Sequence, residues 1–230
     1  MQVMGADTSG ALPSVELAVI IACRNEGPTI GKMVAEIRRT IPQIQIWVFD
    51  NLSTDNTASA ALENGAQVIP INSGGKGFVI RSGLTLVRAE YVVLIDGDAT
   101  YPVSDMPRLL ALARNHQDTM VVGSRITSLQ SMTLIRKIGN WIFTYLLKVR
   151  TGEKLTDALS GYRVLPRSLI DKLHLTANGF EIEVELILEV FRNGGKIIEV
   201  PVAYYAREKT THSKLHAFRD GWSILLRIVR

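Results

Sequence analysis

The stretch Tyr91-Val92-Val93-Leu94-Ile95-Asp96-Gly97-Asp98 decides the expected fold of this chain. Its short apolar run predicts a buried strand, and two aspartates follow at the carboxyl end of that strand. Open α/β sheets bind their ligands outside the carboxyl ends of their strands. Two carboxylates one residue apart can share a hard divalent cation, which often bridges substrate phosphates. We therefore interpret the pair as a sign of metal-assisted chemistry on a nucleotide, although Asp-Gly-Asp is also a common turn sequence.

The residues around this stretch alternate between strand and helix patterns. Apolar runs predict strands at 17–22, 44–49 and 67–71, and helical spacing predicts helices at 30–41, 57–63 and 77–89. Four strand-helix repeats indicate a mostly parallel sheet covered on both faces by helices.

The second half is less regular. We expect helices at 106–115 and 180–191 and strands at 120–123 and 196–204. Two segments near 132–150 and 216–230 are amphipathic and rich in basic residues, with Trp141 and Trp222 among their apolar positions. Such helices either cover the sheet or lie on a membrane surface. We expect the tryptophans to be core residues or anchors at a membrane edge.

Bulk properties limit the function. The 230 residues fit a single α/β domain over 15–230, preceded by a loose tail over 1–14 that lacks the pattern of a secretory signal. Cys23 is the only cysteine, which excludes an internal disulfide and fits a cytoplasmic setting. No run reaches the 18 or more apolar residues of a spanning helix. The net charge of +4 is concentrated near the C-terminus and suits phosphates or an anionic membrane. We expect no nucleic-acid partner.

Three common phosphate-binding signatures are missing. The first predicted strand leads into Cys23-Arg24-Asn25-Glu26-Gly27-Pro28, which is not a dinucleotide fingerprint. Gly74-Gly75-Lys76-Gly77 continues with Phe78, so it is not a P-loop. The Gly-rich basic loop of sugar nucleotidylyltransferases is also lacking. Instead, polar clusters follow four predicted strands, at 24–26, 50–51, 72–76 and 96–98. Parallel strands would bring these clusters to one edge of the sheet.

Several longer motifs occur in a consistent order from Glu16 to the end. They include "IIACRNEGPTIG", "VFDNLSTDNT", "GGKGFVIRSGL", "VVLIDGDATYP", "VGSR", "DALSGYRVLPRSL", "GFEIEVEL" and "EVPVAYYAREKTTHSKL". Together they resemble the inverting family 2 glycosyltransferases, and within them the polyprenyl-phosphate sugar synthases of the dolichol-phosphate mannose synthase-like branch. The resemblance implies a single-domain GT-A nucleotide-sugar transferase fold. It also implies metal-dependent inverting transfer of a hexose from a GDP- or UDP-sugar to a polyprenyl phosphate, peripherally at the cytoplasmic membrane face.

The same resemblance implies a role for individual residues. Asp96 and Asp98 would hold Mg²⁺ or Mn²⁺, and Asp98, Asp157, Arg125 and Arg163 would be the catalytic set. The acceptor phosphate would meet Arg125, Arg207 and Lys214. The nucleotide sugar would contact Ala22, Arg24, Glu26, Asp50, Lys76, Arg81, Asp96, Gly97 and Asp98. The chain departs from the family pattern at Ala22, at Leu52 and at His212, and the last of these affects the expected pose of Lys214.

Asp157 distinguishes two kinds of acceptor. A hydroxyl acceptor needs a carboxylate to take its proton, and Asp157 occupies the region where relatives carry that base; this is the soluble alternative, with a small metabolite or glycan as acceptor. A lipid phosphate has a second pKa of about 6 and is already largely ionised at neutral pH, so that it needs no base. Glu181 and Glu183 are either ordinary first-turn acids of a helix or part of the site.

Overall fold

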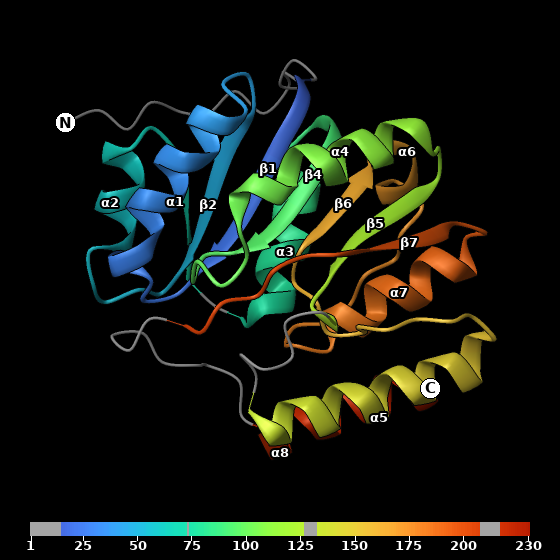
Figure 1. Cartoon of the computed structure of the whole chain (residues 1–230). Helices are drawn as coiled ribbons and strands as arrows, with labels where there is room; N and C mark the ends of the chain where they lie inside the picture. The colour runs from blue at the N-terminus through green and yellow to red at the C-terminus, as the bar shows by residue number, and fades with distance from the viewer. Residues whose placement is uncertain (1–14, 73, 127–132, 208–216) are drawn as a thin grey trace.

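The central sheet forms from seven strands in the computed structural model, which describes residues 15–72, 74–126, 133–207 and 217–230 (Figure 1). Across the sheet the strand order is β3-β2-β1-β4-β6-β5-β7. The strands are β1 (Val15–Cys23), β2 (Gln45–Asn51), β3 (Gln67–Ile71), β4 (Ala89–Asp96), β5 (Thr119–Ser124), β6 (Arg163–Pro166) and β7 (Lys196–Pro201).

Six of these strands run in one direction. β1 pairs in parallel with β2 and β4, and in this register Ala22 lies opposite both Phe49 and Asp96. β3 and β7 extend the two ends in parallel with β2 and β5, whereas β6 is antiparallel to β4 and β5. The mostly parallel sheet expected from the sequence is therefore confirmed. The carboxyl ends of the six parallel strands meet at one edge, where the predicted polar clusters follow β1, β2, β3 and β4.

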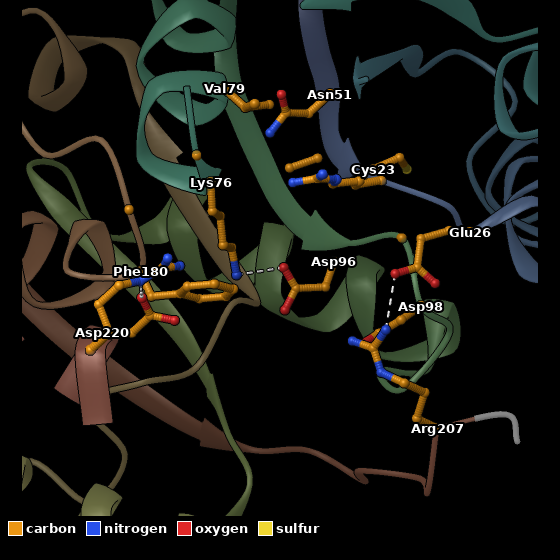
Figure 2. A pocket seen from close by; sticks show the side chains of 16 residues that line it. Cys23, Glu26, Asn51, Lys76, Val79, Asp96, Asp98, Phe180, Arg207 and Asp220 are labelled. Atoms are coloured by element: carbon orange, nitrogen blue, oxygen red, sulfur yellow. Dashed lines mark hydrogen bonds and ion pairs between the residues drawn. The ribbon is translucent and has the colours of Figure 1, made fainter. Parts of the chain in front are cut away.

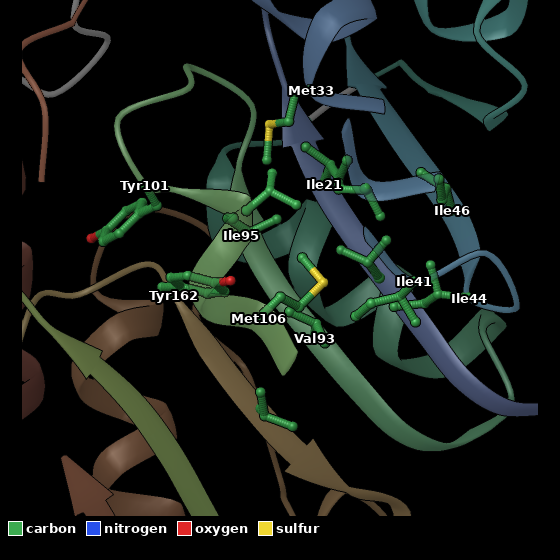
Figure 3. Packing of buried hydrophobic residues seen from close by; sticks show 14 of the residues in the cluster. Ile21, Met33, Ile41, Ile44, Ile46, Val93, Ile95, Tyr101, Met106 and Tyr162 are labelled. Atoms are coloured by element: carbon green, nitrogen blue, oxygen red, sulfur yellow. The ribbon is translucent and has the colours of Figure 1, made fainter. Parts of the chain in front are cut away.

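Helices cover both faces of the sheet. On one face, α1 (Gly27–Thr40) and α4 (Met106–Asn115) bury apolar residues such as Met33 and Met106 against Ile21 and Val93 (Figure 3). The short α2 (Thr57–Glu63) packs on α1, and the 3-10 turn η1 (Val103–Asp105) leads into α4. On the other face lie α3 (Lys76–Leu86), α6 (Arg167–Ile170) and α7 (Ile182–Arg192).

Two helices lie beyond this sandwich. α5 (Leu134–Thr151) and α8 (Ala217–Val229) contact each other and α7 (Figure 1). An amphipathic helix usually buries its apolar side, but α5 does not. Its buried residues include Asn140 and Thr144, whereas Trp141 is 69% exposed. The interpretation that this helix covers the sheet with its apolar stripe is therefore wrong. Within the described residues, no helix is both long and apolar enough to cross a bilayer.

Some element boundaries differ from those expected. α3 ends at Leu86, and Ala89 already belongs to β4 because it pairs with Val15 of β1. The last strand stops at Pro201 rather than residue 204. β6 was not expected, because four residues ending in a proline carry little periodicity and their antiparallel pairing is set by distant strands. The expected tail over 1–14 lies outside the described residues.

Candidate active site

The strand ends enclose a cavity of about 210 Å³ at the predicted edge of the sheet (Figure 2). Most of the residues predicted to bind the nucleotide sugar line it. They come from the ends of β1 and β4 and from the start of α3, and Arg207 joins them from the segment after β7. The predicted residues in this cavity are Ala22, Arg24, Glu26, Lys76, Asp96, Gly97, Asp98 and Arg207.

The loops that form this wall have unusual backbone geometry. Asn25, Leu52 and Ala99, which follow β1, β2 and β4, all have positive φ angles between 53° and 56°. Such a conformation is costly for residues with a Cβ and is concentrated at functional sites. The left-handed backbone at Leu52 explains why Asn or Gly would be expected there. Glycine is needed at position 75 for a steric reason, since a Cβ there would lie 2.6 Å from the carbonyl oxygen of Asn178.

A chain of alternating charges runs from the cavity into the core. The ammonium group of Lys76 lies 2.6 Å from Asp96 Oδ1 and 2.8 Å from Glu183 Oε1. Glu183 Oε2 in turn lies 2.9 Å from Nη2 of Arg163. Burial alone would lower the pKa of Lys76, but the charges of Asp96 and Glu183 raise it well above its ordinary value. Lys76 is therefore a fixed cation in the cavity wall.

Arg207 joins the carboxylates on the opposite side of the cavity (Figure 2). Its Nη1 lies 2.9 Å from Glu26 Oε1, and its Nη2 contacts Asp98 Oδ2. Asp98 is 4% exposed, and its Oδ1 accepts hydrogen bonds from the amide and the hydroxyl of Thr100. These bonds hold the Asp98 carboxylate at the edge of the cavity.

A second cavity, also of about 210 Å³, adjoins the first and shares Lys76, Asp96, Asp98, Phe180 and Arg207 with it. Arg125 and Tyr204 line its polar part. Its other walls come from α5 and α8, and they include Ile135, Arg136, Asn140, Phe143 and Ile224. This cavity therefore combines charged side chains with apolar side chains of α5 and α8.

Asp157 does not line either cavity but lies behind Arg125. It is 2% exposed, and its carboxylate accepts hydrogen bonds from the backbone amide, Nε and Nη2 of Arg125 at 2.9, 2.7 and 2.6 Å. Burial alone would raise the pKa of Asp157, but Arg125 outweighs this and holds that pKa below its ordinary value. The structure therefore pairs Asp157 with Arg125.

Three further predicted residues lie away from both cavities. Arg163 is fully buried on β6, where it donates to the carbonyl oxygens of Ser160 and Ala158. Arg81 donates to the carbonyl oxygen of Ala177, and Asp50 accepts from the amide of Ser53. Lys214 and His212 lie outside the described residues.

Asn51 is a cavity residue that the sequence reasoning missed. Its side chain is 7% exposed, and its Nδ2 donates to the carbonyl oxygen of Gly74 at 3.1 Å. Its Oδ1 is buried and has no hydrogen-bond partner among the described residues. Consecutive strand residues point to opposite faces, so choosing between Asp50 and Asn51 required the orientation of β2. Phe180, next to the predicted acids Glu181 and Glu183, was missed as well.

Known proteins provide a comparison for this arrangement. A family model described as "Glycosyl transferase family 2" matches residues 18–174. Glycosyltransferase AglJ of Haloferax volcanii is 31% identical over 93% of this chain and 71% of its own length. The dolichyl-phosphate hexose transferase of the same organism is also 31% identical, over 94% of this chain and 93% of its own.

Solved structures agree on the fold. The glucosyl-3-phosphoglycerate synthase of Mycobacterium tuberculosis, in complex with Mn²⁺, UDP-glucose and phosphoglyceric acid, has a TM-score of 0.74 with 19% sequence identity. The match covers 94% of this chain and 79% of that chain. The expected nucleotide-sugar transferase fold is thereby confirmed. With two thirds of the chain inside the family model and relatives at 31% identity, this protein belongs to glycosyl transferase family 2 and is a glycosyltransferase.

Proposed function

We propose that this protein transfers a hexose from a nucleotide-diphosphate sugar to a polyprenyl phosphate, with inversion at the anomeric carbon. The observation that carries the proposal is the pair of adjoining cavities. The first is lined by polar residues at the strand ends, and the second is lined by Arg125 and by apolar residues of α5 and α8. A charged donor and an acceptor with a phosphate head and a hydrocarbon tail match these two environments. The name of the dolichyl-phosphate hexose transferase supports the same acceptor class.

The first cavity suits the donor. Asn51 lines this cavity, and a side-chain amide can hydrogen-bond to uracil and to guanine, so that a UDP- or a GDP-sugar fits. Lys76 and Arg207 supply positive charge near the shared wall of the two cavities, where the diphosphate would lie. Negative charge builds on the diphosphate as the sugar leaves, and fixed cations stabilise that charge without reorganisation.

Asp96 and Asp98 fit a hard divalent cation such as Mg²⁺ or Mn²⁺. Their ligand atoms are carboxylate oxygens at the cavity edge, and among the described residues no group of three or more His, Cys, Asp or Glu side chains could hold a metal ion. Mg²⁺ commonly binds through one or two carboxylates together with substrate phosphates and water. When bound, such an ion would neutralise charge on the departing diphosphate. The Mn²⁺ and UDP-glucose in the glucosyl-3-phosphoglycerate synthase complex support this proposal.

The second cavity suits the acceptor phosphate and the first part of its hydrocarbon chain. Arg125 and Arg136 offer positive charge, and Phe143 and Ile224 offer apolar contact. In the proposed step, a phosphate oxygen of the acceptor forms a bond to the anomeric carbon. The bond from that carbon to the donor diphosphate breaks on the opposite side, and its electrons stay on the diphosphate.

This step needs no general base. Both carboxylate oxygens of Asp157 accept hydrogen bonds from Arg125, and the pKa of Asp157 is held low, so it is a weak proton acceptor. An ionised phosphate brings no proton to remove. The soluble alternative, with a hydroxyl acceptor and Asp157 as base, is favoured by one observation: the structural similarity to an enzyme whose complex contains phosphoglyceric acid. The engagement of Asp157 by Arg125 favours the lipid phosphate.

We propose a peripheral position at the cytoplasmic membrane face, and the outer face of α5 supports the contact with a membrane. α5 exposes Leu134, Ile135, Ile138, Trp141, Ile142, Tyr145 and Val149, and α8 adds Trp222 and Val229. Lys148 and Arg150 lie exposed beside them. The polar Asn140 and Thr144 instead face the protein, where they accept hydrogen bonds from the amides of Leu159 and Ala158. Apolar residues with tryptophan and flanking cations are typical of helices that lie in a membrane interface.

The test offers labelled GDP- and UDP-hexoses to three acceptors: a polyprenyl phosphate, the matching polyprenol without phosphate, and 3-phosphoglycerate. Each reaction is run with Mn²⁺ and with EDTA. We expect labelled product in the organic phase only with the polyprenyl phosphate and only with metal. Transfer to 3-phosphoglycerate or to the polyprenol at a comparable rate would contradict the lipid-phosphate acceptor and favour the hydroxyl alternative.

A further inference from the structure

Glu199, on β7, binds the turn that carries Asp157. Its Oε1 accepts a hydrogen bond from the amide of Asp157 at 2.8 Å. Its Oε2 accepts from the amide and the hydroxyl of Thr156 at 2.7 and 2.9 Å. One carboxylate thus fixes two consecutive amides of a loop that lies 42 residues away in the sequence. Hydrogen bonds to an ionised acceptor are about twice as strong as neutral ones.

The Thr156-Asp157 turn, which Glu199 binds, also fixes Arg125. The carboxylate of Asp157 accepts three hydrogen bonds from Arg125, and the Arg125 guanidinium lies 5.3 Å from the centre of the Tyr204 ring. The hydroxyl of Thr156 also lies 2.9 Å from that of Ser124, the residue before Arg125. Asp157 and Arg125 are 2% and 8% exposed, so this pair has little freedom to move.

We propose that Glu199 is a positioning residue for the acceptor: through Asp157 it fixes the orientation of Arg125 in the second cavity. The inference rests on the proposed function in that Arg125 meets the acceptor phosphate. A guanidinium binds a phosphate best when its N–H groups are held in one plane beforehand. Glu199 accepts its hydrogen bonds from the Thr156-Asp157 turn, and it therefore acts on Arg125 through Asp157.

The experiment measures the KM of the acceptor and the KM of the donor separately for wild type and for Glu199→Gln. A glutamine can accept only through its oxygen, so one of the two amides loses its partner and the turn shifts. We expect the acceptor KM to rise by about tenfold or more, since small misplacements of this kind have such effects. The donor KM should stay within about twofold. Thr156→Val removes one donor to Glu199 without changing charge and should give a smaller rise in the acceptor KM.

The matched control is Glu189→Gln. Glu189 is 2% exposed and accepts from the amide of His174, far from both cavities. This variant should lower the melting temperature and leave both KM values unchanged. If Glu199→Gln behaves like Glu189→Gln, Glu199 has only a structural role and the proposal is wrong.

A double-mutant cycle tests whether the effect passes through Arg125. In an Arg125→Lys background, which keeps the charge beside Asp157, Glu199→Gln should add little to the acceptor KM, because coupled residues are not additive. An undiminished effect in that background would overturn the proposal. The ratio of the acceptor KM to the donor KM can be measured with whichever acceptor the wild type uses. A failure of the lipid-phosphate proposal is therefore distinguishable from a failure of this one.

Discussion

α1 and α5 are both amphipathic helices, but they face in opposite senses. α1 buries its apolar residues, and Ile30, Val34 and Ile37 are all fully buried against the sheet. α5 exposes most of its apolar residues and buries Asn140 and Thr144 together with Leu147. The first arrangement is the usual one for a helix between a core and water. The second one leaves an apolar surface exposed, as the proposed membrane contact requires.

The difference extends to the two cavities. The proposed donor half, formed by β1 to β4 with α1 and α3, presents carboxylates and backbone groups at the strand ends. The proposed acceptor half adds apolar walls from α5 and α8 to the cation Arg125. A transferase that joins a water-soluble donor to a membrane-bound acceptor needs both surroundings within one site. Four predictions test whether this contrast is real.

The largest expected effect is on stability. Ile37→Ala should lower the free energy of unfolding by about 2–5 kcal/mol, because it leaves a cavity in the core. Ile138→Ala, the matched change on α5, should alter it by less than about 0.5 kcal/mol, since Ile138 is 50% exposed. Urea unfolding of the two variants measures this. Equal costs would show that the outer face of α5 is buried in the folded protein.

The next effect is on turnover. Asp98→Asn should reduce kcat by about 100- to 1000-fold, by analogy with removing one electrostatic contact to a transition state. The loss should be the same with every acceptor, because Asp98 belongs to the donor half. Initial rates at saturating Mn²⁺ and a thermal unfolding curve check it, with Asp171→Asn, just after α6, as a surface control. A rate close to that of wild type would refute the metal role of Asp98.

A smaller effect concerns membrane binding. Replacing Trp141 and Trp222 together by alanine should weaken binding to vesicles that contain anionic lipid by about tenfold, or about 1.4 kcal/mol. Leu62→Ala on α2 is the control, because Leu62 is 56% exposed on the other half of the molecule. Vesicle sedimentation gives the comparison. If both variants bind like wild type, the exposed face of α5 and α8 does not meet the membrane.

The smallest effect is a pH dependence. The acceptor phosphate has a second pKa of about 6, so kcat/KM for the acceptor should fall to about half at pH 6. Asp157 has a pKa below its ordinary value, and its carboxylate therefore loses its charge, and its contribution to stability, only at a much lower pH. In Asp157→Asn, kcat/KM for the acceptor should still fall near pH 6. If this fall shifts to another pH or disappears in that variant, Asp157 acts as a base.

Local patterns predicted much of the fold. The predicted elements at 57–63, 67–71 and 106–115 coincide with α2, β3 and α4. In these segments the apolar period and the turn residues agree with the tertiary packing. β6 was missed because its antiparallel place between β4 and β5 depends on partners far away in the sequence.

The candidate site was predicted in its outline and less well in its details. Sequence order and strand ends were enough to bring Glu26, Lys76, Asp96 and Asp98 to one cavity. They were not enough to distinguish Asp50 from Asn51, since that choice depends on which face of β2 meets the cavity. Nor could they predict that Asp157 binds Arg125 or that Glu199 binds the turn that carries Asp157.

By itself, the amino-acid sequence determined the parallel α/β sheet, the family resemblance and the polar edge, because each depends on short-range periodicity and on the residues that end each strand. Only the tertiary structure decided which way α5 faces, which partner each buried charge takes, and that the two cavities share a wall. These features depend on contacts between residues that are distant in the chain, and no local pattern records such contacts.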